Sequence, residues 1–180
     1  MAKINILPPS VFNRIAAGEV VDRPYSIVKE LVENAIDAGA SEIEIRIEKG
    51  GKSYITVQDN GEGVEYADLK SLFLPHATSK IANADDLESV VTLGFRGEAV
   101  ASIAAVSRTS YTSKRENGEC YKIECNGGEI GVPTVTAGGE KGTLAEVSDL
   151  FYNTPVRLKF LKSDKAEEGD ISTFINRFML

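Results

Sequence analysis

Acids and one amide form a stripe along a predicted helix near the start of the chain. At about 100° per residue, the polar face carries Glu30, Glu33, Asn34 and Asp37, opposite an apolar face of Val28, Leu31, Val32, Ala35 and Ile36. Asn is unfavourable inside a helix because its amide competes for backbone hydrogen bonds, and acids near a helix C-terminus oppose the helix dipole. Pro24 suits the first turn and Gly39 suits the position after the last turn, so we expect the helix to end soon after Asp37.

Two interpretations of this stripe are open. It is either the ordinary solvated face of an amphipathic helix or a site that carries out chemistry. In a site, Glu30 acts as a general base, and Asn34, one turn later, supplies its amide oxygen to a metal ion. The helix alone does not choose between the two.

A strand followed by glycines comes next. Residues 53–58 alternate like a strand and run into Asp59-Asn60-Gly61-Glu62-Gly63. Asn-Gly is also a strong hairpin signal. Residues 64–73 lack the period-two pattern of a return strand, so we predict a helix there in place of a hairpin.

A second glycine-containing segment precedes a predicted helix over residues 100–106. Its sequence is Gly94-Phe95-Arg96-Gly97-Glu98-Ala99. Backbone N–H groups at a helix N-terminus point outward, and the helix dipole favours anions. The segment is therefore a candidate phosphate cradle, although such loops also precede helices that bind nothing.

These blocks, in this order and with a late Gly142-Thr143 pair in a predicted strand, resemble the GHKL ATPase superfamily and, within it, the MutL family of DNA mismatch repair proteins. The stretches that carry the resemblance are Ile15-Ala16-Ala17-Gly18-Glu19-Val20-Val21, Val32-Glu33-Asn34-Ala35-Ile36-Asp37-Ala38-Gly39-Ala40, His76-Ala77-Thr78-Ser79-Lys80-Ile81, Gly94-Phe95-Arg96-Gly97-Glu98-Ala99 and Phe151-Tyr152-Asn153-Thr154-Pro155. They span nearly the whole chain.

The resemblance implies a fold and an activity. The fold is α+β, a two-layer sandwich of a mixed, mainly antiparallel sheet covered on one face by helices, as in the GHKL or Bergerat ATP-binding fold. The implied cofactors are ATP and Mg²⁺, and slow ATP hydrolysis would act as a conformational switch. The implied partners are a mismatch recognition protein of the MutS family, DNA bound weakly through the larger protein, and a second copy in a nucleotide-dependent homodimer. A cytoplasmic protein without a membrane partner is expected.

The resemblance also assigns roles by position. Glu30 matches the residue that activates the attacking water, and Asn34 matches the Mg²⁺ ligand. Asp59 matches the acceptor for the adenine amino group, next to Gly61 and Gly63. The remaining nucleotide-binding positions are Ala38, Thr143, the lid residues Thr78, Ser79 and Lys80, and the phosphate cradle Gly94, Phe95, Arg96, Gly97, Glu98 and Ala99.

Composition sets outer limits. With 180 residues, of which 42% are hydrophobic, the chain can bury one core and is expected to form one domain. Cys120 and Cys125 lie on a predicted strand at an odd separation, which points them to opposite faces, so we expect unpaired structural thiols. The net charge of −7 argues against strong non-specific DNA binding. Near the end of the chain, Arg157, Lys159, Lys162 and Lys165 form either a small basic patch or an ordinary charged surface.

The expected order of elements follows from periodicity. Strands are predicted at 42–47, 53–58, 107–113, 120–125, 134–137 and 142–147, a mainly helical stretch at 65–106, and a last helix around 171–178. We expect residues 1–180 to be a single N-terminal ATP-binding domain, truncated before the second (transducer) domain. The lid, 73–97, and the N-terminal arm, up to Val21, are expected to be mobile without nucleotide and ordered by ATP; the alternative is an arm that packs permanently on its own domain.

Other classes of protein fit less well or differ in activity. A sensor histidine kinase domain belongs to the same superfamily, but it needs a phospho-accepting His on an upstream helix. The single His of this chain, His76, lies in the lid. The alternative that stays open is a nucleotide-binding module with negligible turnover on its own.

Overall fold

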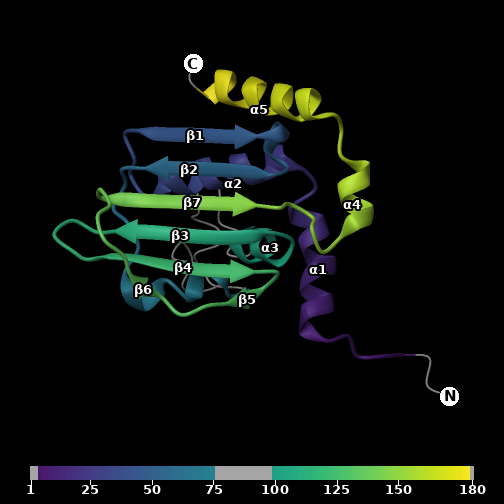
Figure 1. Ribbon diagram of the computed structural model, residues 1–180, viewed down its shortest axis with the longest axis horizontal. Helices are drawn as coiled ribbons and strands as arrows, with labels where there is room; N and C mark the ends of the chain where they lie inside the picture. The colour runs from purple at the N-terminus through teal and green to yellow at the C-terminus, as the bar shows by residue number, and fades with distance from the viewer. Residues whose placement is uncertain (1–3, 76–98, 179–180) are drawn as a thin grey trace, which may run out of the picture.

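One antiparallel sheet positions the site. In this computed structural model, which describes residues 4–75 and 99–178, seven strands form the sheet (Figure 1). They are β1 (Ile43–Glu48), β2 (Tyr54–Asp59), β3 (Arg108–Lys114), β4 (Cys120–Asn126), β5 (Glu129–Ile130), β6 (Thr134–Val135) and β7 (Gly142–Ser148). The order is β1-β2-β7-β3-β4-β5, with β6 paired to β4, and every ladder between the described strands is antiparallel.

Helices lie mainly on one face of the sheet. They are α1 (Pro9–Val20), α2 (Pro24–Asp37), α3 (Ala99–Ala105), α4 (Pro155–Phe160) and α5 (Asp164–Phe178), with 3-10 turns η1 (Lys49–Gly51), η2 (Tyr66–Asp68) and η3 (Ser71–Phe73). In Figure 1, α2 and α3 lie behind the sheet, α5 runs along its β1 edge, and α1 and α4 lie beyond one end. The arrangement is the α+β sandwich that the sequence predicts.

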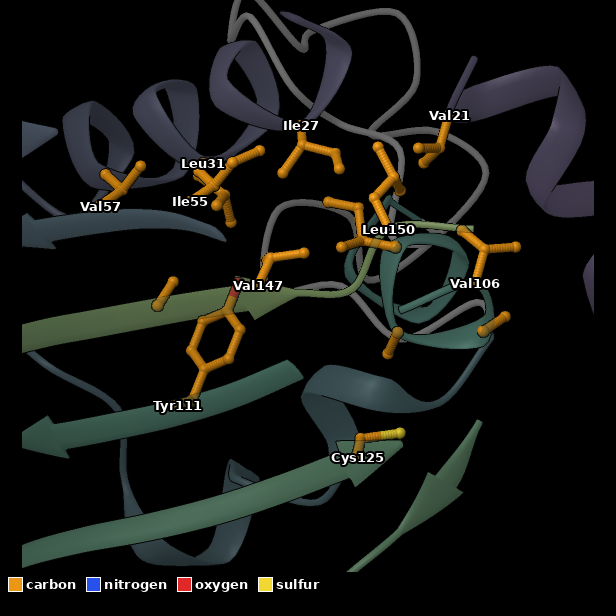
Figure 2. Close-up of a cluster of buried hydrophobic side chains, with 14 of the residues drawn as sticks. Val21, Ile27, Leu31, Ile55, Val57, Val106, Tyr111, Cys125, Val147 and Leu150 are labelled. Atoms are coloured by element: carbon orange, nitrogen blue, oxygen red, sulfur yellow. The ribbon is translucent and has the colours of Figure 1, made fainter. Parts of the chain in front are cut away.

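The core fills the layer between the sheet and the helices (Figure 2). Because side chains alternate along a strand, β2 and β7 direct Ile55, Val57 and Val147 toward Ile27 and Leu31 of α2. Cys120 and Cys125 are both free and buried, as expected of structural thiols. Within the described ranges, no helix has the length and apolar character needed to cross a lipid bilayer.

Two local predictions differ from the structure, and one helix, in the N-terminal arm, was not predicted. The helix predicted over residues 64–73 is replaced by η2 and η3; Leu69, which follows η2, and Phe73, in η3, are nevertheless buried. The N-terminal arm contains α1, since Pro9 occupies the first helical turn, where its missing N–H is tolerated. On α2, Glu33 is only 4% exposed and Ile36 is 38% exposed, so α2 is covered on more than its sheet-facing side.

Candidate functional site

Three segments meet at one end of the sheet. Register places Thr143, near the start of β7, beside Asp59 at the end of β2 and beside Ser113 on β3. The preceding Gly142 has φ +125°, and a Cβ there would lie 1.9 Å from the Asp59 carbonyl oxygen. Only glycine permits this close approach of β7 to Asp59.

Asp59 is a half-buried carboxylate held by the backbone. Its Oδ1 accepts a hydrogen bond of 2.8 Å from the Gly61 N–H. Burial raises the pKa of Asp59, and the hydrogen bonds from the backbone N–H groups of Gly61 and Thr143 oppose that rise. The side chain is thus kept partly out of water while remaining an acceptor.

The end of α2 packs against the loop that follows Asp59. The Glu62 N–H donates to the Ala38 carbonyl over 2.9 Å, and a Cβ on Gly61 would lie 2.7 Å from that same carbonyl oxygen. Gly63 has φ +76°, and a Cβ there would lie 2.5 Å from the Lys114 carbonyl oxygen at the end of β3. Ala38, Asp59, Gly61, Gly63 and Thr143, predicted from separate stretches, therefore lie together.

Hydroxyl groups on β3 complete this end of the site. Ser113 Oγ accepts from the Val64 N–H over 2.9 Å and lies 2.8 Å from Thr143 Oγ1. Sequence analysis missed Ser113, and with it Tyr111, which lies two positions earlier on the same face. Periodicity predicted this strand, but Arg-Thr-Ser-Tyr-Thr-Ser-Lys has no apolar face that would indicate which of its side chains point into the site.

The polar stripe predicted from the sequence lies on α2, whose C-terminal end packs against the Asp59 loop. Glu30 and Asn34 are half-buried and one turn apart. In the described parts of the chain, no group of three or more His, Cys, Asp or Glu side chains could hold a metal ion. The residues present do fit Mg²⁺ bound with a nucleotide, because Mg²⁺ retains waters and phosphate oxygens and needs only one or two protein ligands. The Asn34 amide oxygen would be that ligand.

Part of the predicted site lies outside the described residues. These positions are Thr78, Ser79 and Lys80 of the lid and Gly94, Phe95, Arg96, Gly97 and Glu98 of the cradle. Ala99, the last cradle residue, is buried at the start of α3. Their roles, like those of Glu30 and Asn34, stay predictions.

The basic residues near the end of the chain do not form one patch. The half-buried Arg157 packs its guanidinium on Gly18 of α1, where a Cβ would lie 1.4 Å from Nη2, and near the Phe151 ring. Lys162 Nζ pairs with Asp170 Oδ2 at 3.0 Å, and Lys159 and Lys165 are exposed. This part of the surface agrees better with an ordinary charged surface.

Comparisons with known proteins agree with this geometry. Residues 23–130 match the family described as "Histidine kinase-, DNA gyrase B-, and HSP90-like ATPase". Over its whole length the chain is 52% identical to DNA mismatch repair protein MutL of Clostridium botulinum (strain Kyoto / Type A2). Over 98% of its length it is 51% identical to MutL of Edwardsiella ictaluri (strain 93-146). It spans only 27% and 28% of those two proteins.

Solved structures show the same fold. The Aquifex aeolicus MutL ATPase domain complexed with ADP superposes with a TM-score of 0.67 at 35% identity, covering 88% of this chain and 55% of that one. The N-terminal domain of a DNA repair protein gives a TM-score of 0.75, also at 35% identity, over 91% of this chain and 46% of that one.

Proposed function

Because this chain belongs to the MutL family of DNA mismatch repair proteins and is an ATP-binding module of the GHKL type, we propose that it is the nucleotide-dependent switch of a longer repair protein. It binds ATP with Mg²⁺, and within that longer protein it hydrolyses ATP slowly. The isolated chain, which spans about a quarter of the length of its relatives, is proposed to be a weak ATPase or an inactive one.

The Asp59 carboxylate is the observation that carries this proposal. It is half-buried, anchored by two backbone N–H groups, and followed by Gly61 and Gly63, whose missing side chains let the loop pack closely against Ala38 and Lys114. A fixed acceptor in a partly dehydrated position suits the exocyclic amino group of adenine, because hydrogen bonds strengthen away from water. The same position would leave guanine, which has a carbonyl there, facing a second acceptor.

Glu30 is the proposed catalytic base. It takes the proton of the attacking water, which a carboxylate within hydrogen-bond reach can do. Asn34 holds Mg²⁺ one turn away, and the metal ion supplies positive charge to the phosphate oxygens when bound. Thr78, Ser79, Lys80 and the 94–99 cradle are proposed to enclose the phosphates.

The N-terminal arm is the proposed route from nucleotide to assembly. Ile4 and Ile6 are 89% and 98% exposed, and Phe12 and Ile15 on α1 are also exposed, while Ala17 of the same helix is buried. Large apolar side chains left in water favour burial against another surface. We propose that ATP binding stabilises a homodimer through this arm, and that the longer cytoplasmic protein then recruits a MutS-family partner and contacts DNA weakly.

Two substitutions in the longer protein test the site. Glu30→Ala is expected to lower single-turnover hydrolysis about 10²- to 10⁴-fold while ATP affinity, measured by calorimetry, is kept. Asn34→Ala is expected to lose the Mg²⁺ dependence of binding. Glu168→Ala, an exposed acid on α5, is the matched control and should change neither quantity.

The outcomes separate the candidates. Hydrolysis that survives Glu30→Ala removes Glu30 from the chemistry, and unchanged Mg²⁺ dependence in Asn34→Ala removes Asn34 from the metal site. Tight ATP binding without single-turnover hydrolysis in the unmodified longer protein would support the alternative, a binding module that responds to nucleotide occupancy alone.

A further inference from the structure

The Tyr111 hydroxyl is a buried polar group to which neither the sequence motifs nor the family resemblance assigns a role. Its side chain is 5% exposed, and the hydroxyl oxygen has no hydrogen-bond partner among the described residues. Burying a hydroxyl without a partner is unfavourable, and such groups are rare in folded proteins. A bound molecule is one way to satisfy it.

The position of Tyr111 points to the base end of the nucleotide site. Tyr111 lies on β3 two residues before Ser113, on the face that carries Asp59 and Thr143. Figure 2 shows its hydroxyl directed away from β3 into the layer beneath α2. The ring is fixed by an edge-to-face contact with Phe73, with centroids 5.6 Å apart.

Electrostatics link Tyr111 to Asp59. Burial first, and the negative charge of Asp59 second, raise the pKa of the Tyr111 hydroxyl. The hydroxyl therefore keeps its proton and stays a donor, whereas Asp59 is an acceptor. One donor and one acceptor are thus available at the same end of the sheet.

Adenine presents the complementary pair. Its amino group is a donor, and ring atom N1 beside it is an acceptor. N1 lies on the far side of the ring system from N9, which carries the ribose and must face the phosphates. The ring nitrogen that reaches a deeply buried group is therefore N1. Guanine reverses both hydrogen-bonding positions, because it has a carbonyl acceptor in place of the amino group and an N–H donor at N1.

We propose that Tyr111 is a second base-reading residue, whose hydroxyl donates a hydrogen bond to N1 of adenine, directly or through one bridging water, while Asp59 accepts from the amino group. This inference rests on the proposed ATP binding. It assigns Tyr111 a role in specificity and leaves the chemistry at the phosphates to other residues.

Calorimetric titration of this chain tests the proposal with Tyr111→Phe and three ligands. The ligands are ATP, an analogue with carbon in place of N1, and an analogue that lacks the amino group. Tyr111→Phe is expected to lower the affinity for ATP about two- to tenfold, which is the effect of losing one hydrogen bond. The N1 analogue should bind the wild type more weakly than ATP does, and Tyr111→Phe should add no further loss, because the two changes remove the same contact. Loss of the amino group from the ligand should lower its affinity for the wild type and for Tyr111→Phe by the same factor.

Two controls test whether a change in affinity is specific to the Tyr111 hydroxyl. Tyr121→Phe removes a hydroxyl that donates to Glu119 over 2.8 Å on β4 and should leave all affinities unchanged. The ligand-free Tyr111→Phe protein should melt at the same temperature as the wild type or higher, since the lost hydroxyl is buried and has no partner among the described residues.

The results that overturn the proposal differ from those that overturn ATP binding itself. A wild type that binds ATP, together with a Tyr111→Phe variant that binds it equally well, removes Tyr111 from the base site. Independent losses for Tyr111→Phe and the N1 analogue do the same, and so does a clearly lower melting temperature, which would mean that the hydroxyl has a structural partner. A wild type that binds no ATP refutes the proposed function and, with it, this inference.

Discussion

Gly61→Ala tests whether the close packing between α2 and the Asp59 loop holds the site together. Gly61 does not have a positive φ, so alanine meets no backbone strain there. Its Cβ would lie 2.7 Å from the Ala38 carbonyl oxygen, 2.9 Å from the Ala38 Cβ and 3.0 Å from Asp59 Oδ1. The first contact is to backbone, so the loop or the end of α2 must move.

The magnitude follows from that movement. Overpacking of this kind costs about 1–3 kcal/mol of unfolding free energy, which is about 3–10 °C in melting temperature for a chain of this size. The displacement also moves the Asp59 carboxylate relative to α2. Loss of a hydrogen bond to a charged group is worth about 1.5–3 kcal/mol, so ATP affinity should fall about ten- to hundredfold.

Thermal melts and calorimetric ATP titration measure both effects. Gly118→Ala is the matched control, because Gly118 also lacks a positive φ and its nearest atom would be 3.4 Å away. Ala38→Gly in the Gly61→Ala background should restore only part of the stability, since the carbonyl contact remains. Wild-type melting and ATP affinity in Gly61→Ala would refute the view that this contact positions Asp59.

Two further expectations concern charge and motion. Burial raises the pKa of Asp59, so the native state holds its proton to higher pH than the unfolded state, and stability falls as pH rises from about 4 through that raised pKa. The ligand-free Asp59→Asn variant should therefore melt at a higher temperature than the ligand-free wild type at pH 7, and this difference should disappear below about pH 4. The variant should also lose ATP binding. A lower melting temperature than the wild type at pH 7 would contradict the expectation. In hydrogen exchange, residues 4–20 and the lid should gain protection when a non-hydrolysable ATP analogue binds, and full protection of both in the ligand-free protein would show instead that the arm packs permanently on its own domain.

Much of the fold follows from local pattern. Pro24 at the start of α2 and Gly39 after its end set that helix within a residue or two, because both residues act through their own backbone conformation. The strands at 43–48, 54–59, 120–126 and 142–148 lie within one or two residues of those predicted, since period-two alternation reports burial on one face. The α1 helix was missed because Pro8, Pro9 and Gly18 interrupt the apolar pattern.

The site residues divide in the same way. The resemblance of short contiguous motifs identified four site residues, Asp59, Gly61, Gly63 and Thr143. Tyr111 and Ser113 were not identified, because β3 is polar at most positions and its inner face is defined only once β7 pairs with it. The burial of Glu33 was likewise missed, since helical periodicity assigns Glu33 to the polar face and does not report its burial in the folded chain.

The sequence by itself determined the helix α2, most of the strands and their order, the family and the chemical types at the site. These depend on local backbone preference, on hydrophobic period and on motif strings, all of which are properties of neighbouring residues. Only the tertiary structure decided that Asp59 stands beside Thr143, that Gly61 and Gly142 have no room for a Cβ, and that the Tyr111 hydroxyl is buried without a partner among the described residues. Each of these depends on register and distance between segments far apart in the chain, and long-range packing fixes those quantities.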